Sequence, residues 1–136
     1  MVRGICCLRP NAKGMSENIT VTAIIGRFLE HGRIYVFANK GKFQSESNLV
    51  YMASADIMPR NLYHRVEAFI PLENKTVRSQ ILDQVLPALI NDTKNTWKLN
   101  KNGEYSKKKY KDKTFCAHTY FMKNPSLSGQ GSLAKI

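Results

Sequence analysis

The amino-acid sequence predicts a mixed α/β fold, and three observations support that class. Short runs of β-branched and aromatic residues recur through the first seventy residues, as is typical of strands. Residues 77–90 carry apolar side chains at helical spacing. The chain has 136 residues, of which 43% are hydrophobic and 23% are charged. This is the length and composition of one globular domain with a sizeable core, and it excludes disorder for most of the chain.

Five strands are expected in the first part of the chain. Between them, residues 26–30 are compatible with one helical turn, and residues 56–62 are expected to be irregular around a proline. The expected strands cover residues 3–8 (mostly buried), 19–25, 33–38 (covered on both faces), 49–53 and 66–72.

One helix is clear in the second part of the chain. Its apolar stripe covers residues 77–90, and Asn74 is a suitable N-cap. Pro87 is expected to kink or shorten the last turn, because proline lacks the backbone N–H that a helix uses. Residues 97–105 resemble a hairpin that turns at Asn102-Gly103.

The charge of the chain points to an anionic partner. There are 21 Lys and Arg against 10 Asp and Glu, a formal charge of +11. Residues 94–113 hold eight lysines against two acidic residues, a charge of +6, and residues 107–113 are expected to be exposed. The arginines lie in the first ninety residues, and they are the better lead because a guanidinium can bind two phosphate oxygens at once. Residues 124–136, rich in serine and glycine, are expected to form a loose tail.

Several classes of protein are excluded by what the sequence lacks. Gly41-Lys42 has neither the upstream glycine nor the following hydroxyl of a phosphate-binding loop, and no protein-kinase signature is present. No apolar run is long enough to span a bilayer and no signal-peptide core follows Met1, so we expect a cytoplasmic protein. Cys6, Cys7 and Cys116 are too few for a disulfide framework, and we interpret them as buried, reduced thiols.

His31-Gly32-Arg33 is one candidate site. If Arg33 begins the strand, His31 and Arg33 lie on one face of it. An arginine can neutralise phosphate oxygens, while an imidazole can donate a hydrogen bond, carry a proton or accept the phosphoryl group. The alternative is a histidine paired with Glu30 beside a surface arginine.

Ser54 to Leu62 is a second candidate site. Small and polar residues follow an expected strand, and Pro59 restricts the backbone, so this loop can present Arg60. The alternative is a plain turn in which Asp56 pairs with Arg60. Arg3 is unusual inside an apolar strand, because an unpaired buried charge is costly, so it either faces a ligand or lies at a frayed end.

Four blocks of sequence resemble the C-terminal domain of bacterial polyphosphate kinase. Their order and spacing fit that family, and the helix and the hairpin have counterparts as well. The blocks are Val2 to Pro10, Ser16 to Ile19, Ile25 to Ile34 and Ser54 to Leu62, and the match continues through Arg65-Val66-Glu67 and Phe69-Ile70-Pro71.

The resemblance implies a fold, an activity and partners. It implies an incomplete phospholipase D-like domain over residues 1–123, a mixed sheet flanked by helices, followed by a loose tail. It implies reversible transfer of the γ-phosphoryl group of ATP to polyphosphate. The expected partners are ATP or ADP, polyphosphate and a missing N-terminal part of the enzyme on another chain, with a homo-oligomer expected for the full enzyme. Mg²⁺ is also expected in the full enzyme, with its ligands outside this chain. The chain by itself is expected to be weakly active or inactive.

The resemblance also assigns site residues. The ATP-binding arginine and histidine of the family fall on Arg3 and His31, and its tunnel arginine falls on Arg60. Arg33, with Arg65, is a secondary contributor, and His31 is the expected catalytic residue. Gly32 departs from the family, which usually has serine there, and this departure removes a possible hydroxyl donor.

Two other functions are open to the same residues. A noncatalytic module could bind RNA or polyphosphate through lysines 94–113, with a steep dependence on salt. A phospholipase D-like nuclease or lipase is disfavoured, because Arg33 stands where that signature has lysine.

Overall fold

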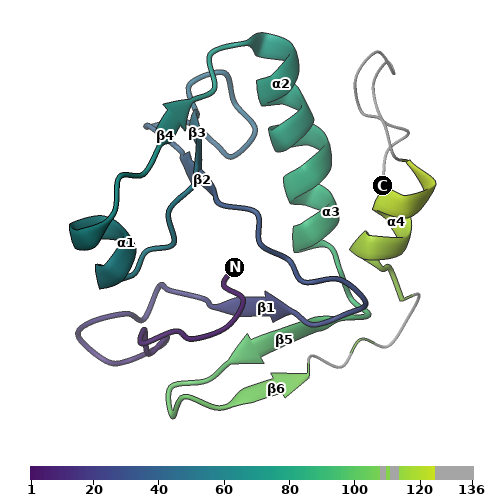
Figure 1. Ribbon diagram of the computed structural model, residues 1–136. Coiled ribbons are helices and arrows are strands. Elements are labelled where there is room, and N and C mark those ends of the chain that lie inside the picture. Colours follow the sequence, from purple (N-terminus) through teal and green to yellow (C-terminus); the bar gives the residue numbers. More distant parts are fainter. Residues whose placement is uncertain (108–109, 111–113, 125–136) are drawn as a thin grey trace. The chain divides into compact units, whose positions relative to one another are not determined.

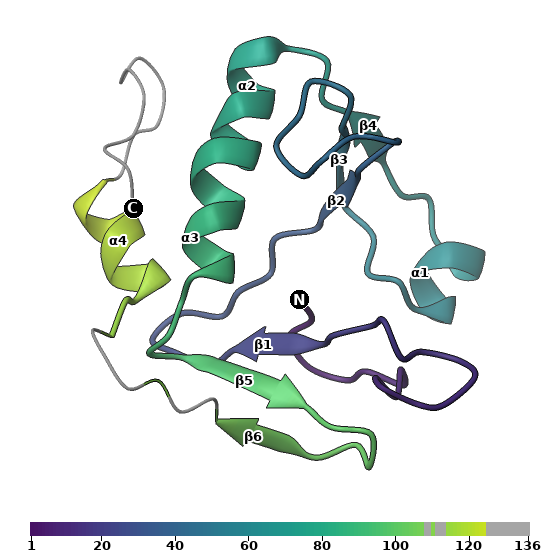
Figure 2. The ribbon, with the colours of Figure 1, turned by 180° about the vertical axis from the view of Figure 1, so that it is seen from behind.

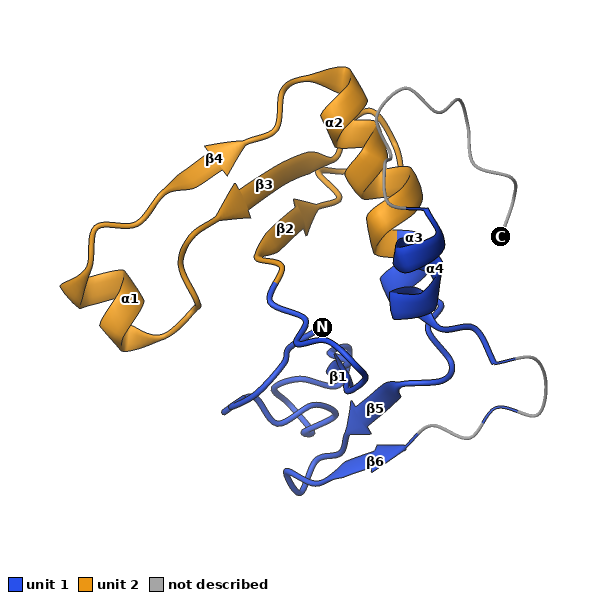
Figure 3. Ribbon diagram, turned by 45° about the vertical axis from the view of Figure 1, so that its right-hand side comes forward, with its two compact units in different colours: residues 1–31, 87–125 blue, residues 32–86, 126–136 orange. Residues whose placement is uncertain are grey.

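The computed structural model describes residues 1–107, 110 and 114–124, and within them the α/β class is confirmed. The chain forms two compact units (Figure 3). Unit 1 holds residues 1–31 and the described residues from 87 on, and unit 2 holds residues 32–86. Each unit has a three-stranded antiparallel sheet, where a single mixed sheet was expected. All four strand pairs of the described residues are antiparallel, so neither sheet is mixed.

Unit 1 is built on the sheet β1-β5-β6, with strands Thr22–Ile24, Thr96–Leu99 and Tyr105–Lys107 (Figures 1 and 2). The hairpin of β5 and β6 confirms the turn predicted at Asn102-Gly103, and Gly103 adopts a φ of 88°, which favours glycine. The last described element is the helix α4, Ala117–Lys123. The buried apolar side chains of this unit are Val21, Ala23, Ile24, Ala88, Leu99 and Ala117.

Unit 2 is built on the meander β2-β3-β4, with strands Ile34–Phe37, Leu49–Ala53 and Phe69–Pro71. The helix α1, Pro59–His64, lies between β3 and β4 in the chain. One face of the sheet packs on the following helix: Val50, Ile81 and Leu82 are buried together. Ile34, Val36, Leu72, Val85 and Leu86 surround them.

The long helix consists of α2 (Lys75–Ser79), the π-helical η1 (Gln80–Val85) and α3 (Leu86–Ile90) in unbroken succession (Figure 1). The predicted N-cap is confirmed, since Asn74 Oδ1 accepts a hydrogen bond from Val77 N–H at 3.1 Å. Pro87, expected to kink or shorten the last turn, lies inside the helix, which runs on to Ile90. Leu86 N–H instead bonds to the Ile81 carbonyl, five residues back. This wider turn reduces the clash between the proline ring and the preceding carbonyls.

Three local predictions are wrong. Residues 3–8 form no strand. Val2 N–H donates to the Thr22 carbonyl, but beyond Val2 this segment forms no strand ladder with other described residues. Residues 26–30 form bends instead of a helical turn. Residues 56–62 are not irregular throughout, since α1 begins at Pro59, where a proline needs no hydrogen-bond acceptor for an N–H.

The predicted burial of two regions is also wrong. The strand β2 is only half covered, and Ile5 is 82% exposed. Cys6 and Cys116 are half-buried and Cys7 is exposed, although all three thiols are free.

Much of the predicted basic stretch 107–113 and nearly all of the predicted tail 124–136 lie outside the described residues, so the tail and the boundary at residue 123 stay predictions.

A loop between β2 and β3 is held by internal polar contacts. The buried Asn48 side chain donates to the carbonyls of Ala38 at 3.1 Å and Lys42 at 2.9 Å. From the neighbouring helix, Arg78 donates to the carbonyls of Ser45, Glu46 and Asn48. A single guanidinium therefore ties the loop to α2.

Replacing Arg78 with methionine is expected to lower the free energy of unfolding by about 1–2 kcal/mol, because charge-assisted hydrogen bonds to the loop carbonyls are lost. Urea unfolding followed by circular dichroism measures this loss. Lys75→Met, at an exposed position of the same helix, is the control. Equal unfolding midpoints for the two variants would show that Arg78 contributes nothing to the loop.

Candidate functional site

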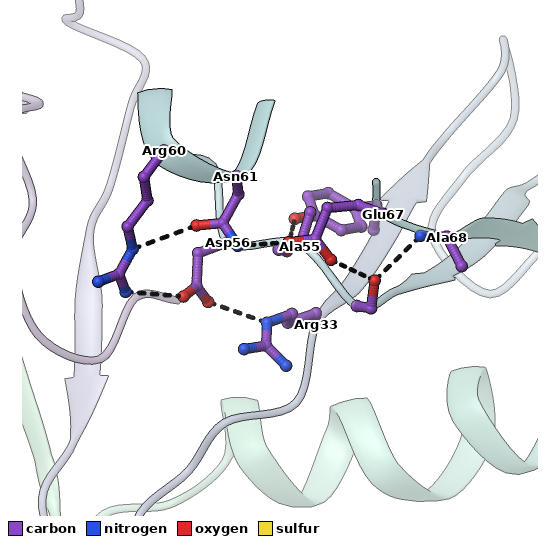
Figure 4. A network of polar contacts seen from close by, with 9 residues as sticks. Arg33, Ala55, Asp56, Arg60, Asn61, Glu67 and Ala68 are labelled. Atoms are coloured by element: carbon purple, nitrogen blue, oxygen red, sulfur yellow. Dashed lines mark hydrogen bonds and ion pairs between the residues drawn. The ribbon is translucent and has the colours of Figure 1, made fainter. Parts of the chain in front are cut away.

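The carboxylate of Asp56 lies between two arginines of unit 2 (Figure 4). Its Oδ1 accepts a hydrogen bond from Arg33 Nε at 2.9 Å, and its Oδ2 lies 3.7 Å from Arg60 Nη2. Arg33 precedes β2 and Asp56 follows β3. Because these strands are antiparallel, with Ile34 opposite Met52, the start of one and the end of the other meet at one end of the sheet.

A second group of contacts holds the segment that carries Arg60. The Asn61 side chain, 3% exposed, donates from Nδ2 to Glu67 Oε1 at 2.6 Å and accepts at Oδ1 from Arg60 Nε at 3.4 Å. Ser54 Oγ donates to the other oxygen of Glu67 and accepts from Ala68 N–H at 3.0 Å. Asn61 and Glu67 therefore join the start of α1 to the approach to β4.

The two arginines differ in what they present to solvent. The side chain of Arg33 is 26% exposed and that of Arg60 is 62% exposed. The contact between Arg60 and Asp56 is long and largely exposed, so it contributes little to stability. Arg60 is consequently the more accessible cation of the cluster. The Asp56–Arg60 pairing considered above is therefore present, but Asp56 makes its shorter contact with Arg33.

Glu67 gives the cluster a dependence on pH. The Ser54 hydroxyl, and next the Asn61 amide, lower the pKa of Glu67 below its ordinary value of 4.5 by donating to the carboxylate. A depressed pKa in the folded state stabilises the fold above the ordinary value, and this contribution is lost as the pH falls through the folded pKa.

Replacing Glu67 with glutamine is therefore expected to destabilise the chain at neutral pH, with the deficit narrowing once the pH falls below 4.5. Urea unfolding midpoints measured across this range test the prediction. Glu73→Gln, at an exposed position, is the matched control. A deficit that stays constant down to strongly acidic pH would contradict the assigned role.

Arg3 and His31 belong to unit 1, and both are exposed. Burial raises the pKa of Tyr105 in β6, the charge of Cys6 adds to that rise and the charge of Arg3 opposes it. His31 and Arg33 do not share a strand face as predicted, because β2 begins only at Ile34.

Glu30, the residue considered above as a partner of His31, contacts a different histidine. Glu30 Oε1 lies 2.9 Å from Nε2 of His118, a buried histidine of α4. His118 gives no signal in the sequence, because the seven residues of α4 are too few for a clear helical pattern. His118 is a neighbour of Glu30 only because the fold brings α4 next to residue 30.

The supporting roles of Asn61 and Glu67 were likewise not predicted from the sequence. Both lie within the quoted blocks, but nothing in their spacing signals that they bond to each other. For metal binding, the part of the chain that the structure describes contains no group of three or more His, Cys, Asp or Glu side chains that could hold an ion. In the same part, no helix is long and apolar enough to cross a membrane.

Comparisons with known proteins identify the family. Residues 1–118 match the family described as "Polyphosphate kinase C-terminal domain 2". The chain belongs to the polyphosphate kinase family. It is 53% identical over 131 residues to a polyphosphate kinase of Erythrobacter litoralis (strain HTCC2594), and 96% of the chain is covered. It is 46% identical over 105 residues to that of Prochlorococcus marinus (strain MIT 9313), with 77% covered.

The fold agrees with a solved member of the family. The crystal structure of polyphosphate kinase from Porphyromonas gingivalis matches with a TM-score of 0.77 and 33% sequence identity, over 90% of this chain. The chain spans a small part of these polyphosphate kinases: 18% of the Erythrobacter protein, 14% of the Prochlorococcus protein and 18% of the Porphyromonas chain. The predicted resemblance to the C-terminal domain is thus confirmed.

Proposed function

We propose that this chain supplies nucleotide- and polyphosphate-binding residues to a polyphosphate kinase that transfers the γ-phosphoryl group of ATP reversibly to polyphosphate. The observation that carries this proposal is the family match over residues 1–118. The accessible guanidinium of Arg60, on a segment of unit 2 held by the hydrogen bond between Asn61 and Glu67, also supports the proposal. The chain alone is expected to turn over poorly.

The proposed roles follow from the demands of phosphoryl transfer. The reaction needs its groups held in line and needs positive charge at the oxygens of the transferred phosphoryl group. Arg3 and His31 bind the nucleotide, with the His31 ring donating to a phosphoryl oxygen or carrying the proton. Arg60 binds polyphosphate, and Arg33 contributes charge from beside Asp56.

The remaining requirements are assigned to the rest of a polyphosphate kinase. ATP or ADP is the nucleotide substrate. Mg²⁺, which neutralises phosphate charge in such reactions, is held by residues outside this chain. The complete enzyme is a homo-oligomer in the cytoplasm.

The decisive experiment combines this chain with the Erythrobacter litoralis relative from which the matching region has been removed. ATP formation from ADP and polyphosphate is expected only when both parts are present. His31→Ala is expected to lower the restored activity about 100-fold, the usual cost of removing a donor to a developing phosphoryl charge. His64→Ala, at an exposed histidine of α1, is the matched control. Restored activity that survives His31→Ala would overturn the role of His31.

A polyanion-binding module is the second candidate, and one observation favours it. Lys94, Lys98, Lys101 and Lys107, the described lysines of the basic stretch, are all exposed. Exposed lysines bind polyanions by releasing counterions, without a shaped site. This function requires that binding weaken when these lysines, rather than Arg60, are replaced.

A further inference from the structure

The outer face of the β2-β3-β4 sheet is apolar along its whole width. Directly opposed residues of antiparallel strands point to the same side, and alternate residues point to opposite sides. The register therefore collects one set of side chains on the face away from Val50, and we call this set the aromatic face: Tyr35, Phe37, Leu49, Tyr51, Ala53, Phe69 and Pro71. It contains no charged residue.

The rings of this face pack against one another. Tyr51 stacks on Phe69 with ring centroids 4.9 Å apart, and Tyr35 lies 5.1 Å from Phe69. Phe37 lies 6.1 Å from Tyr51 in an edge-on arrangement. Despite these contacts, Phe37 remains 53% exposed, Phe69 52% and Leu49 45%. The face is thus a continuous apolar surface, unlike the scattered apolar side chains that monomeric proteins commonly expose.

The core of unit 2 does not account for the aromatic face. That core lies on the opposite side of the sheet, where Val50 packs with Ile81 and Leu82 of the long helix. Strands with one solvated face normally alternate apolar and polar residues. Polar residues on the outer face of this sheet would therefore leave the packing of the core unchanged. The apolar choice at every outer position indicates a second layer.

We propose that the aromatic face is the docking surface for the remainder of a polyphosphate kinase, meaning the part outside the region that this chain matches. The same fold, with a TM-score of 0.77, forms only 18% of a much longer solved chain. The relative at 53% identity is likewise matched over 18% of its length. A second copy is a poorer occupant, because two chains of charge +11 repel each other. The inference rests on the proposed function and names the surface by which the parts join.

Association tests the docking surface directly. The chain is co-expressed with the truncated Erythrobacter litoralis kinase, and the affinity of the recovered complex is measured. Phe69→Ser is expected to weaken binding at least about 30-fold, as for a central aromatic anchor. Tyr63→Ser, at a 78% exposed tyrosine of α1, is expected to change it little. Circular dichroism checks folding, and Phe37→Ser carries the test if Phe69→Ser does not fold.

Binding unaffected by both serine substitutions would overturn the proposal, as would a stable dimer of this chain that either substitution abolishes. Association without ATP formation would leave the docking surface standing and count against the proposed function. ATP formation that survives both substitutions would support the proposed function and count against the docking surface.

A second measurement needs no substitution. This chain replaces the matching region of the intact Erythrobacter kinase, and hydroxyl-radical oxidation of Phe37 and Phe69 is compared between this chimera and the isolated chain. Oxidation of both rings is expected to fall at least about tenfold in the chimera, as apolar anchors become desolvated. Equal oxidation in the two proteins would overturn the proposal.

Discussion

Replacing Asp92 with asparagine is expected to lower the free energy of unfolding by about 2–4 kcal/mol. The Asp92 side chain is fully buried in unit 1. Its Oδ1 accepts from Asn95 N–H at 2.6 Å, and its Oδ2 accepts from Ala117 N–H at 2.8 Å. An asparagine amide would turn a donor toward one of these N–H groups and leave it unsatisfied, which carries the full cost of a buried unpaired polar group.

The effect of Asp92→Asn is measured by urea unfolding at neutral pH, followed by circular dichroism. Asp83→Asn is the control, because Asp83 is exposed on η1 and the substitution is the same. An unfolding midpoint shared by the two variants would show that the carboxylate of Asp92 does not hold α4 against the turn after α3.

Replacing Arg60 with alanine is expected to weaken polyphosphate binding about 10- to 100-fold, the equivalent of about 1.5–3 kcal/mol for charge-assisted hydrogen bonds to phosphate. Replacing Asp56 with asparagine should strengthen binding several-fold, because that carboxylate partly neutralises Arg33 and Arg60. The opposite signs of the two effects distinguish an arginine site from a general loss of structure. Isothermal titration with polyphosphate of defined length measures both.

Lys101→Ala controls for charge alone, because it removes one exposed cation from the turn between β5 and β6. It is expected to change affinity less than threefold at physiological salt. If Lys101→Ala and Arg60→Ala weaken binding equally, the chain binds polyanions through diffuse charge, and the polyanion-binding module becomes the better account.

The candidate site was predictable only in part. Arg33, Asp56 and Arg60 could each be singled out because arginines and a carboxylate stand beside expected strands. The contact between Arg33 and Asp56 could not be predicted, because it depends on the register that places Ile34 opposite Met52. The contact between Glu30 and His118 depends in the same way on a helix from the far end of the chain.

Local signals in the sequence determined the elements that local physics controls. Asn74 caps the long helix by bonding to an amide only three residues on, and Gly103 permits the hairpin turn through its own backbone freedom. The run at residues 49–53 became β3 with the expected bounds, and the family resemblance followed from blocks in order.

Only the tertiary structure decided which side chains meet and which apolar runs find partners. Residues 3–8 have the composition of a strand but no ladder to join, whereas the less apolar Tyr105–Lys107 pairs with β5 and becomes one. A strand requires hydrogen bonds to a neighbour, and a site requires groups from separate strands at one sheet end. Both depend on contacts between residues distant in sequence, which composition and spacing do not encode.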